Sequence, residues 1–155
     1  MRLLLKNLLF TFLIPGTVAV YVPVFVLAPA APAGGLWTGL SSVLLATGAA
    51  TYAWCVWDFA SFGRGTPLPL DAPRKLVVRG LYRYTRNPMY VGVLTFIVGW
   101  AVRYRSASLF AYAAVVAIAF ELFVILYEEP HLRLVFGHEY DAYCAAVNRW
   151  LPGPV

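Results

Sequence analysis

Residues 107–127 read ASLFAYAAVVAIAFELFVILY, and Glu121 is the only charged side chain among them. A helix needs about 20 consecutive apolar residues to cross the hydrocarbon core of a bilayer, and this run meets that length. Three further apolar runs precede it, at residues 8–28, 36–57 and 89–102. The sequence therefore predicts an all-α fold, an integral membrane bundle of about four transmembrane helices.

The composition also indicates lipid as the surrounding solvent. Of the 155 residues, 61% are hydrophobic and 12% are charged, whereas a soluble domain carries about 25% charged residues. This length fits a single domain over residues 1–155. The two cysteines, Cys55 and Cys144, lie far apart, so we expect neither a disulfide framework nor a thiolate metal site.

Two of the four runs are predicted to be irregular. Pro15 and Pro23 lie inside the first run, where a missing backbone donor favours a kink. The run at 89–102 is short for a span. It must tilt little, begin within residues 84–88, or form a tight hairpin with the next run.

The basic residues predict an orientation. The segment 29–35 contains no lysine or arginine, whereas the loop 58–88 is rich in arginine and is therefore predicted to be cytoplasmic. Only Arg103 and Arg105 then remain on the opposite side, which places both termini in the cytoplasm. This confinement of positive charge to inter-helix segments favours membrane orientation over nucleic-acid binding. Apolar residues at helical spacing in the tail 128–155 predict an amphipathic helix along the membrane surface.

Polar and aromatic residues gather in the loop and the tail, so we expect one shared site there. The arginines and tyrosines of residues 79–92 have an alternative interpretation, as membrane anchors and an interfacial aromatic belt. Glu128 and Glu129 are adjacent carboxylates at the end of the last run, and they need nearby cations or donors. Arg83 or Arg86 could fill that need, and so could a cationic ligand.

Two other features have weaker chemical interpretations. Glu121 lies two turns inside an apolar run, so it must face protein or water, either as a protonated structural group or as part of a pocket. Glu128 and His131 match half of a Glu-x-x-His di-iron pattern, which requires two such pairs and further carboxylates. With His138 as the only other histidine, we expect no metal site.

Three motifs in order carry a family resemblance. They are RNPMYVG at residues 86–92, LYEEP at 126–130 and FGHEYDAY at 136–143, followed by Arg149 and Trp150. Over roughly residues 63–152 the chain resembles the superfamily of isoprenylcysteine carboxyl methyltransferases and phospholipid methyltransferases, which are membrane enzymes. Isoprenylcysteine enzymes usually have histidine at the position of Asn87, and the asparagine form looks more like phospholipid N-methyltransferases.

The resemblance implies S-adenosylmethionine as the methyl donor. It assigns donor binding to two segments of the loop, residues 80–82 and 86–92, and to the paired carboxylates, and it places two tail residues against the acceptor. The implied cofactor-binding residues are Gly80, Leu81, Tyr82, Arg86, Asn87, Tyr90, Gly92, Glu128 and Glu129, and the implied catalytic residues are Arg149 and Tyr143. Asn87 and Tyr90 would donate hydrogen bonds, while the carboxylates would take the ammonium or ribose hydroxyls of the donor.

The function that follows is methyl transfer at the membrane to a lipophilic acceptor, as in isoprenylcysteine carboxyl methyltransferases. The acceptor would enter sideways from the bilayer, and the donor from the cytoplasm. One alternative is a phospholipid N-methyltransferase of the phosphatidylethanolamine type. Another, of a different class, is a non-enzymatic membrane scaffold or transporter subunit whose polar loop only anchors it.

Overall fold

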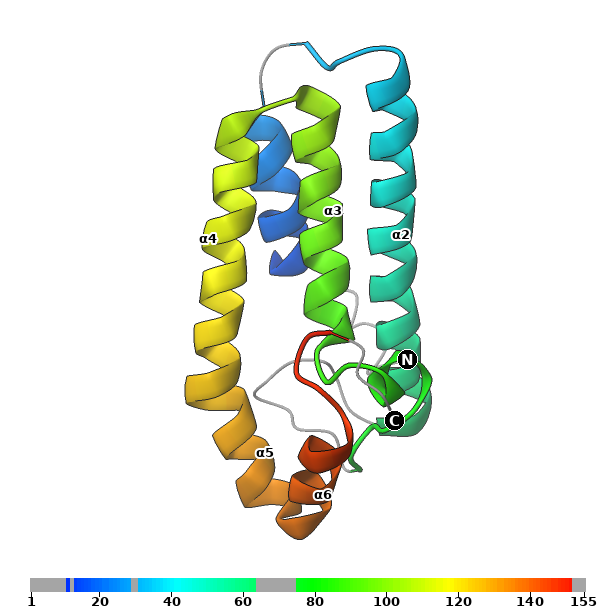
Figure 1. Ribbon diagram of the computed structural model, residues 1–155, viewed down its shortest axis with the longest axis vertical. Helices are drawn as coiled ribbons and strands as arrows, with labels where there is room; N and C mark the ends of the chain where they lie inside the picture. The colour runs from blue at the N-terminus through cyan, green and yellow to red at the C-terminus, as the bar shows by residue number, and fades with distance from the viewer. Residues whose placement is uncertain (1–10, 12, 29–30, 64–74, 152–155) are drawn as a thin grey trace.

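The fold is a bundle of upright helices with two short helices at one end (Figure 1). The computed structural model describes residues 11, 13–28, 31–63 and 75–151. Within these ranges every regular element is a helix. In chain order the elements are η1 (Thr17–Leu27), α2 (Leu36–Asp58), η2 (Phe59–Gly63), η3 (Gly80–Arg83), α3 (Pro88–Tyr104), α4 (Ala107–Phe123), η4 (Val124–Glu128), α5 (Glu129–Phe136) and α6 (His138–Ala146). The all-helical class predicted from the sequence is confirmed.

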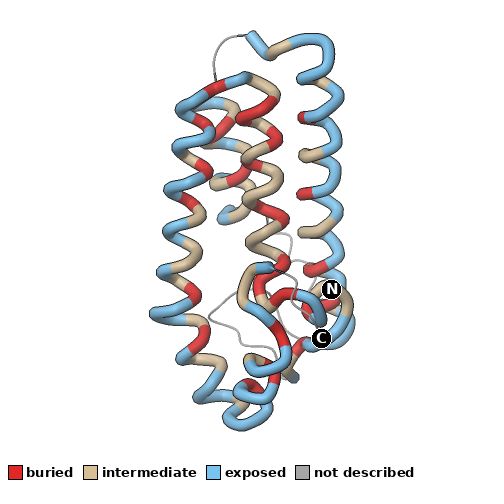
Figure 2. Tube along the Cα trace, viewed as in Figure 1, coloured by how far each residue is buried: buried red, intermediate tan, exposed pale blue. Residues whose placement is uncertain are grey.

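Helix α3 is the centre of the bundle. It packs against α2, α4 and η1, and buried residues recur along its length in Figure 2. Val93 and Ile97 of α3 form a core with Ala19 of η1 and with Ala113 and Val116 of α4. A helix surrounded in this way needs apolar residues on most of its faces, and the sequence of α3 supplies them.

Glycines let α2 and α3 approach closely. A Cβ atom added to Gly48 would lie 2.7 Å from the carbonyl oxygen of Gly92 and 2.7 Å from the backbone nitrogen of Phe96. A Cβ atom on Gly92 would in turn lie 3.1 Å from the carbonyl oxygen of Gly48. Small residues at helix crossings are typical of membrane bundles, where close backbone approach maximises van der Waals contact.

A tight hairpin joins α3 to α4, as one of the sequence interpretations predicted. Arg105 adopts the left-handed conformation with φ 48°, and the Ser106 side chain accepts a hydrogen bond from the backbone of Leu109 to cap α4. Arg103 ties this end to the start of α2 by donating to the Ala33 carbonyl at 3.2 Å and the Thr38 hydroxyl at 2.6 Å.

Two helical segments are long and apolar enough to cross a membrane, Leu36–Phe62 and Ala107–Phe136, while Thr17–Leu27 and Pro88–Tyr104 are shorter apolar helices. A bundle of four spans therefore stays a prediction. The irregularity predicted for the first run is confirmed, because η1 is a wide π-helix with Pro23 inside it. Its expected start, at residues 8–10, lies outside the described residues.

The loop and the tail both differ from the sequence prediction. The loop was expected to begin at Asp58, but the helix continues through η2 to Gly63, and residues 64–74 lie outside the described ranges. The tail was expected to hold one amphipathic helix. Instead α5 continues directly from α4 and η4, and Gly137, with φ 54°, turns the chain into α6. The wider turn of η4 accommodates Pro130, whose ring would clash with the carbonyl four residues earlier in a regular helix.

Candidate functional site

A polar cluster lies at the end of the bundle where α3 begins and α4 ends. Three parts of the chain that are distant in the sequence meet there: η3 with the first turn of α3, the junction of η4 with α5, and the tail after α6. Figure 1 shows the tail, in red, running beside the start of α3. The loop and the tail therefore lie together, while their role as one shared site stays a prediction.

Glu129 is the buried centre of this cluster, with 5% of its surface exposed. Its Oε1 accepts hydrogen bonds from Arg86 Nη1 at 3.0 Å and from Arg149 Nε at 2.8 Å, and its Oε2 accepts from Arg149 Nη2 at 3.1 Å. Arg149 thus binds the carboxylate in a fork, which is the strongest geometry for such a pair. The hydrogen bonds that Arg149 donates to Glu129 raise the pKa of Arg149, so this guanidinium stays charged.

Arg149 also compensates the carboxylate inside the apolar run. Its Nη1 lies 3.1 Å from Glu121 Oε1, and the indole N–H of Trp150 donates to the other oxygen of Glu121. An ionisable residue at this depth must face protein or water. Glu121 faces the tail, and the tail supplies the donors that its carboxylate needs.

Glu128 has a different environment from its neighbour. Its Oε2 accepts a hydrogen bond of 2.7 Å from the Tyr90 hydroxyl. The Tyr90 ring lies 4.6 Å from that of Phe120 and 6.4 Å from that of Trp150, centroid to centroid. Two guanidiniums donate hydrogen bonds to Glu129, and that of Arg133 lies 4.0 Å from its Oε2. A phenol among aromatic rings binds Glu128, so the two adjacent carboxylates are suited to different partners.

The tail is fastened to the start of α3 by its backbone. The Arg149 carbonyl accepts from Thr85 Oγ1 at 3.0 Å and from Asn87 Nδ2 at 3.1 Å, and the Asn148 carbonyl accepts from the Arg86 backbone N–H at 2.9 Å. These bonds fix the segment that carries the Arg149 guanidinium.

A second link joins α6 to η3. The hydroxyl of Tyr143 donates to the Tyr82 carbonyl at 2.7 Å. Burial raises the pKa of both phenols, so both remain neutral donors. Tyr82 in turn packs on Cys55 and Val77, which connects the tail to α2 through η3.

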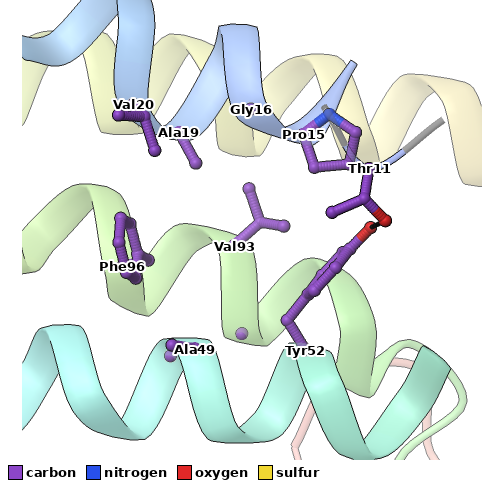
Figure 3. A pocket seen from close by; sticks show the side chains of 11 residues that line it. Thr11, Pro15, Gly16, Ala19, Val20, Ala49, Tyr52, Val93 and Phe96 are labelled. Carbon is purple, nitrogen blue, oxygen red and sulfur yellow. Dashed lines mark hydrogen bonds between the residues drawn. The ribbon is translucent and has the colours of Figure 1, made fainter. Parts of the chain in front are cut away.

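An apolar cavity of about 400 Å³ adjoins the polar cluster between η1, α3 and α4. Tyr90 lines it, together with Met89, Val93 and Phe120. A second cavity, of about 180 Å³, lies between η1, α2 and α3 (Figure 3) and shares Tyr52 with the first. Tyr90 therefore faces an apolar space while its hydroxyl binds Glu128.

The family model described as phospholipid methyltransferase matches residues 36–139, from α2 into α6. The chain belongs to the phospholipid methyltransferase family. Two curated relatives, each named probable protein-S-isoprenylcysteine O-methyltransferase, come from Oryza sativa subsp. indica and subsp. japonica. Each is 37% identical over 92 residues, which are 59% of this chain and 48% of the relative. The chain thus spans about half the length of these relatives. No solved structure matches it.

The superfamily resemblance read from the motifs is therefore confirmed, and the family match ends before Arg149. Of the eleven site residues taken from the resemblance, six meet in the polar cluster, namely Arg86, Asn87, Tyr90, Glu128, Glu129 and Arg149. Tyr82 and Tyr143 form the link between η3 and α6.

The other three predicted site residues lie at packing positions. Gly92 faces Gly48 of α2, and Leu81 packs on the cluster of Cys55, Val77 and Tyr82. Gly80, at φ 58°, lies against the Asp58 carboxylate, where any Cβ atom would overlap an oxygen. A role of these residues in donor binding stays a prediction.

Asp58 is a residue of this region that sequence reasoning missed. It is 1% exposed, its Oδ1 lies 3.4 Å from Arg79 Nε, and its Oδ2 has no hydrogen-bond partner in the described part of the chain. The available signal was an acidic residue directly after an apolar run. Thr85 was also missed, because a threonine between arginines in a loop has no distinguishing pattern.

Proposed function

We propose that this protein is a membrane methyltransferase that transfers the methyl group of S-adenosylmethionine to a lipophilic acceptor, as isoprenylcysteine carboxyl methyltransferases do. The observation that carries the proposal is the position of Tyr90. Its ring lines the apolar cavity, and its hydroxyl binds Glu128 in the cluster of carboxylates and guanidiniums. A polar donor and an apolar acceptor would meet at that boundary.

The polar cluster fits the chemical groups of S-adenosylmethionine. The donor has a carboxylate, an ammonium, ribose hydroxyls and a sulfonium, and when bound it supplies an electrophilic methyl group. The Nε atom of Arg86 is buried and has no hydrogen-bond partner among the described residues, so an anionic group would satisfy it. Glu128 would take the ammonium or the ribose hydroxyls, and the rings of Tyr90 and Trp150 would face the sulfonium.

The apolar cavity fits the lipophilic part of the acceptor. Side chains of η1, α3 and α4 line it, including Val18, Met89, Phe120 and Phe123. These helices are apolar, so a lipid chain would reach the cavity from the bilayer rather than from water. We assign Arg149 to orient the acceptor head group. Three of its five N–H donors bind Glu129 and Glu121, and the two that remain, one on each Nη atom, would bind a carboxylate or phosphate.

Methyl transfer to a carboxylate is an in-line displacement that needs no proton removal. The work of the protein would then be to align the two reactants and to exclude water from between them. Holding reacting groups in a productive geometry contributes about 7–11 kcal/mol in well-oriented systems. The buried, hydrogen-bonded frame around Glu129 is suited to that task.

An amine acceptor is the second candidate, and one observation favours it. The family description is phospholipid methyltransferase, which agrees with the asparagine at position 87. An amine must lose a proton during methylation, so a base would be required. Glu128 is the carboxylate not bound by a guanidinium in the cluster, and it would have that role.

A non-enzymatic role is the third candidate. It is favoured by Glu129, both of whose oxygens bind guanidiniums of the protein itself. Under this alternative the cluster only joins the tail to the bundle. By the distribution of basic residues we further propose that both termini and the site face the cytoplasm.

Calorimetry with S-adenosylhomocysteine separates the enzymatic proposals from the scaffold. We expect detergent-solubilised protein to bind this product of the donor, and Glu128→Gln to weaken binding. Glu139→Gln is the matched control, because Glu139 is exposed on α6. No heat of binding in wild-type protein that is folded by circular dichroism would reject the donor site.

A further inference from the structure

We infer that Thr85 and Asn87 are positioning residues that hold the Arg149 carbonyl and thereby fix the Arg149 guanidinium in the site. The inference rests on the proposed function for its catalytic meaning. We call the hydrogen bonds from Thr85 and Asn87 to the Arg149 carbonyl the clamp on the tail. These bonds do not depend on any ligand. The clamp gives Asn87 a different partner from the donor contact that the family resemblance implies.

Two side chains from one turn converge on one carbonyl oxygen. Thr85 Oγ1 donates at 3.0 Å and Asn87 Nδ2 at 3.1 Å, and both residues are buried, at 8% and 6% exposure. A carbonyl oxygen has two lone pairs, so these two donors fill its capacity. The neighbouring Asn148 carbonyl accepts from the Arg86 backbone at 2.9 Å.

The tail depends on these bonds because it has no regular structure of its own. Helix α6 ends at Ala146, and the following residues to Leu151 belong to no helix. Backbone groups of such a segment must find partners elsewhere. Val147 is buried with Tyr140 and Tyr143, and the next fixed points are the carbonyls of Asn148 and Arg149.

Holding the backbone of Arg149 determines where its side chain can reach. The guanidinium bridges Glu121 of α4 and Glu129 of α5, and Trp150 also binds Glu121. A displacement of about 1 Å in a positioning group is enough to cost about 100-fold in rate. The clamp therefore sets both the fork on Glu129 and the place of Trp150 beside Tyr90.

Limited trypsin digestion measures the clamp without any cofactor. Trypsin cuts after arginine, so opening of the tail is read as release of the peptide that begins at Trp150, quantified by mass spectrometry. When opening is fast, cleavage follows the population of the open form. Thr85→Val removes one hydroxyl at nearly constant shape. That hydroxyl donates to the Arg149 carbonyl and also accepts a long bond of 3.4 Å from the Asn87 backbone N–H. Loss of the bond to the tail alone predicts cleavage roughly 2- to 12-fold faster. Thr85→Ser keeps the hydroxyl and is expected to retain wild-type protection.

Two controls show whether the opening is local. Thr95→Val removes a hydroxyl that bonds only within α3, to the Val91 carbonyl, and is expected to leave cleavage after Arg149 unchanged. Cleavage after Arg133 in each variant serves as the internal standard. If the double variant Thr85→Val with Asn87→Ala is cleaved faster at both arginines, it has lost global structure. The single variant Thr85→Val then tests the clamp.

Turnover supplies the readout that a merely structural clamp would not move. We expect Thr85→Val to lower kcat for methyl transfer by a larger factor than it raises the KM for the donor. Wild-type cleavage after Arg149 in both Thr85→Val and the double variant would overturn the inference. Faster cleavage with unchanged kcat would overturn the positioning role. If wild-type protein transfers no methyl group, the proposed function fails, while the cleavage ratios still test the clamp.

Discussion

Replacing Glu129 by glutamine tests the polar cluster at its centre. The change keeps the size of the side chain but removes the charge that faces Arg86 and Arg149. Glutamine also places an amide N–H₂ group, a donor, where both neighbours are donors. The Arg86 side chain is only 12% exposed, so its guanidinium would remain buried without a full counter-charge.

The magnitude follows from the burial of each partner. Removing one member of a buried ion pair costs about 3–5 kcal/mol, because the other charge stays uncompensated. Arg149 is 31% exposed, so solvent screens its share, and we count mainly the pair with Arg86. We expect Glu129→Gln to lower the free energy of unfolding by about 3 kcal/mol.

Chemical unfolding in detergent, followed by circular dichroism, measures this loss. Glu139→Gln is again the matched control and should change the unfolding free energy by less than about 0.5 kcal/mol. We also expect Glu129→Gln to weaken S-adenosylhomocysteine binding. An unfolding free energy equal to that of the control would refute the assignment of Glu129 as a buried, paired carboxylate.

Three further predictions concern packing, turnover and topology. Gly48→Ala should lower the free energy of unfolding by about 1–3 kcal/mol, because the new Cβ atom would lie 2.7 Å from backbone atoms of α3. Gly39→Ala in the same helix is the control. Its Cβ atom would have nothing within 4 Å, so the same unfolding assay should show a neutral or stabilising change. Arg149→Ala should lower the single-turnover rate at saturating donor more than it lowers donor affinity, and a wild-type rate would remove Arg149 from the site. A cysteine label at Ser106 should report the side opposite to one at Ala142, and labelling of both from one side would contradict the proposed orientation.

The positions of the helices and the ion pair between Glu129 and Arg86 could be predicted from the sequence. Hydropathy and length determine where α2, α3 and α4 run, because lipid admits only apolar helices with satisfied backbones. The pairing of Glu129 with Arg86 was one of the stated alternatives, since adjacent carboxylates at a helix end require cations. Both arguments use local composition and charge alone.

The remaining features depend on contacts between distant segments. The last apolar run was expected to end at Glu128 and Glu129, but η4 widens the helix and lets α5 continue from α4. Nothing in the local sequence distinguishes Thr85 as a partner of the Arg149 carbonyl, because that bond joins residues far apart in the chain. The position of Asp58 after an apolar run gave no indication of its partners, Gly80 and Arg79, which lie beside it in the fold.

The most direct test of the proposed function is methyl transfer by the purified protein. Detergent-solubilised protein is incubated with methyl-labelled S-adenosylmethionine and, in parallel, with a prenylated cysteine analogue or with phosphatidylethanolamine, and label in the lipid fraction is counted. We predict labelling of the prenylated cysteine analogue as a base-labile methyl ester, reduced at least tenfold in Arg149→Ala, which corresponds to about 1.4 kcal/mol of transition-state stabilisation. Labelling of phosphatidylethanolamine alone would transfer the assignment to an amine acceptor, and no labelling of either lipid by folded protein that binds S-adenosylhomocysteine would contradict the proposed acceptor class.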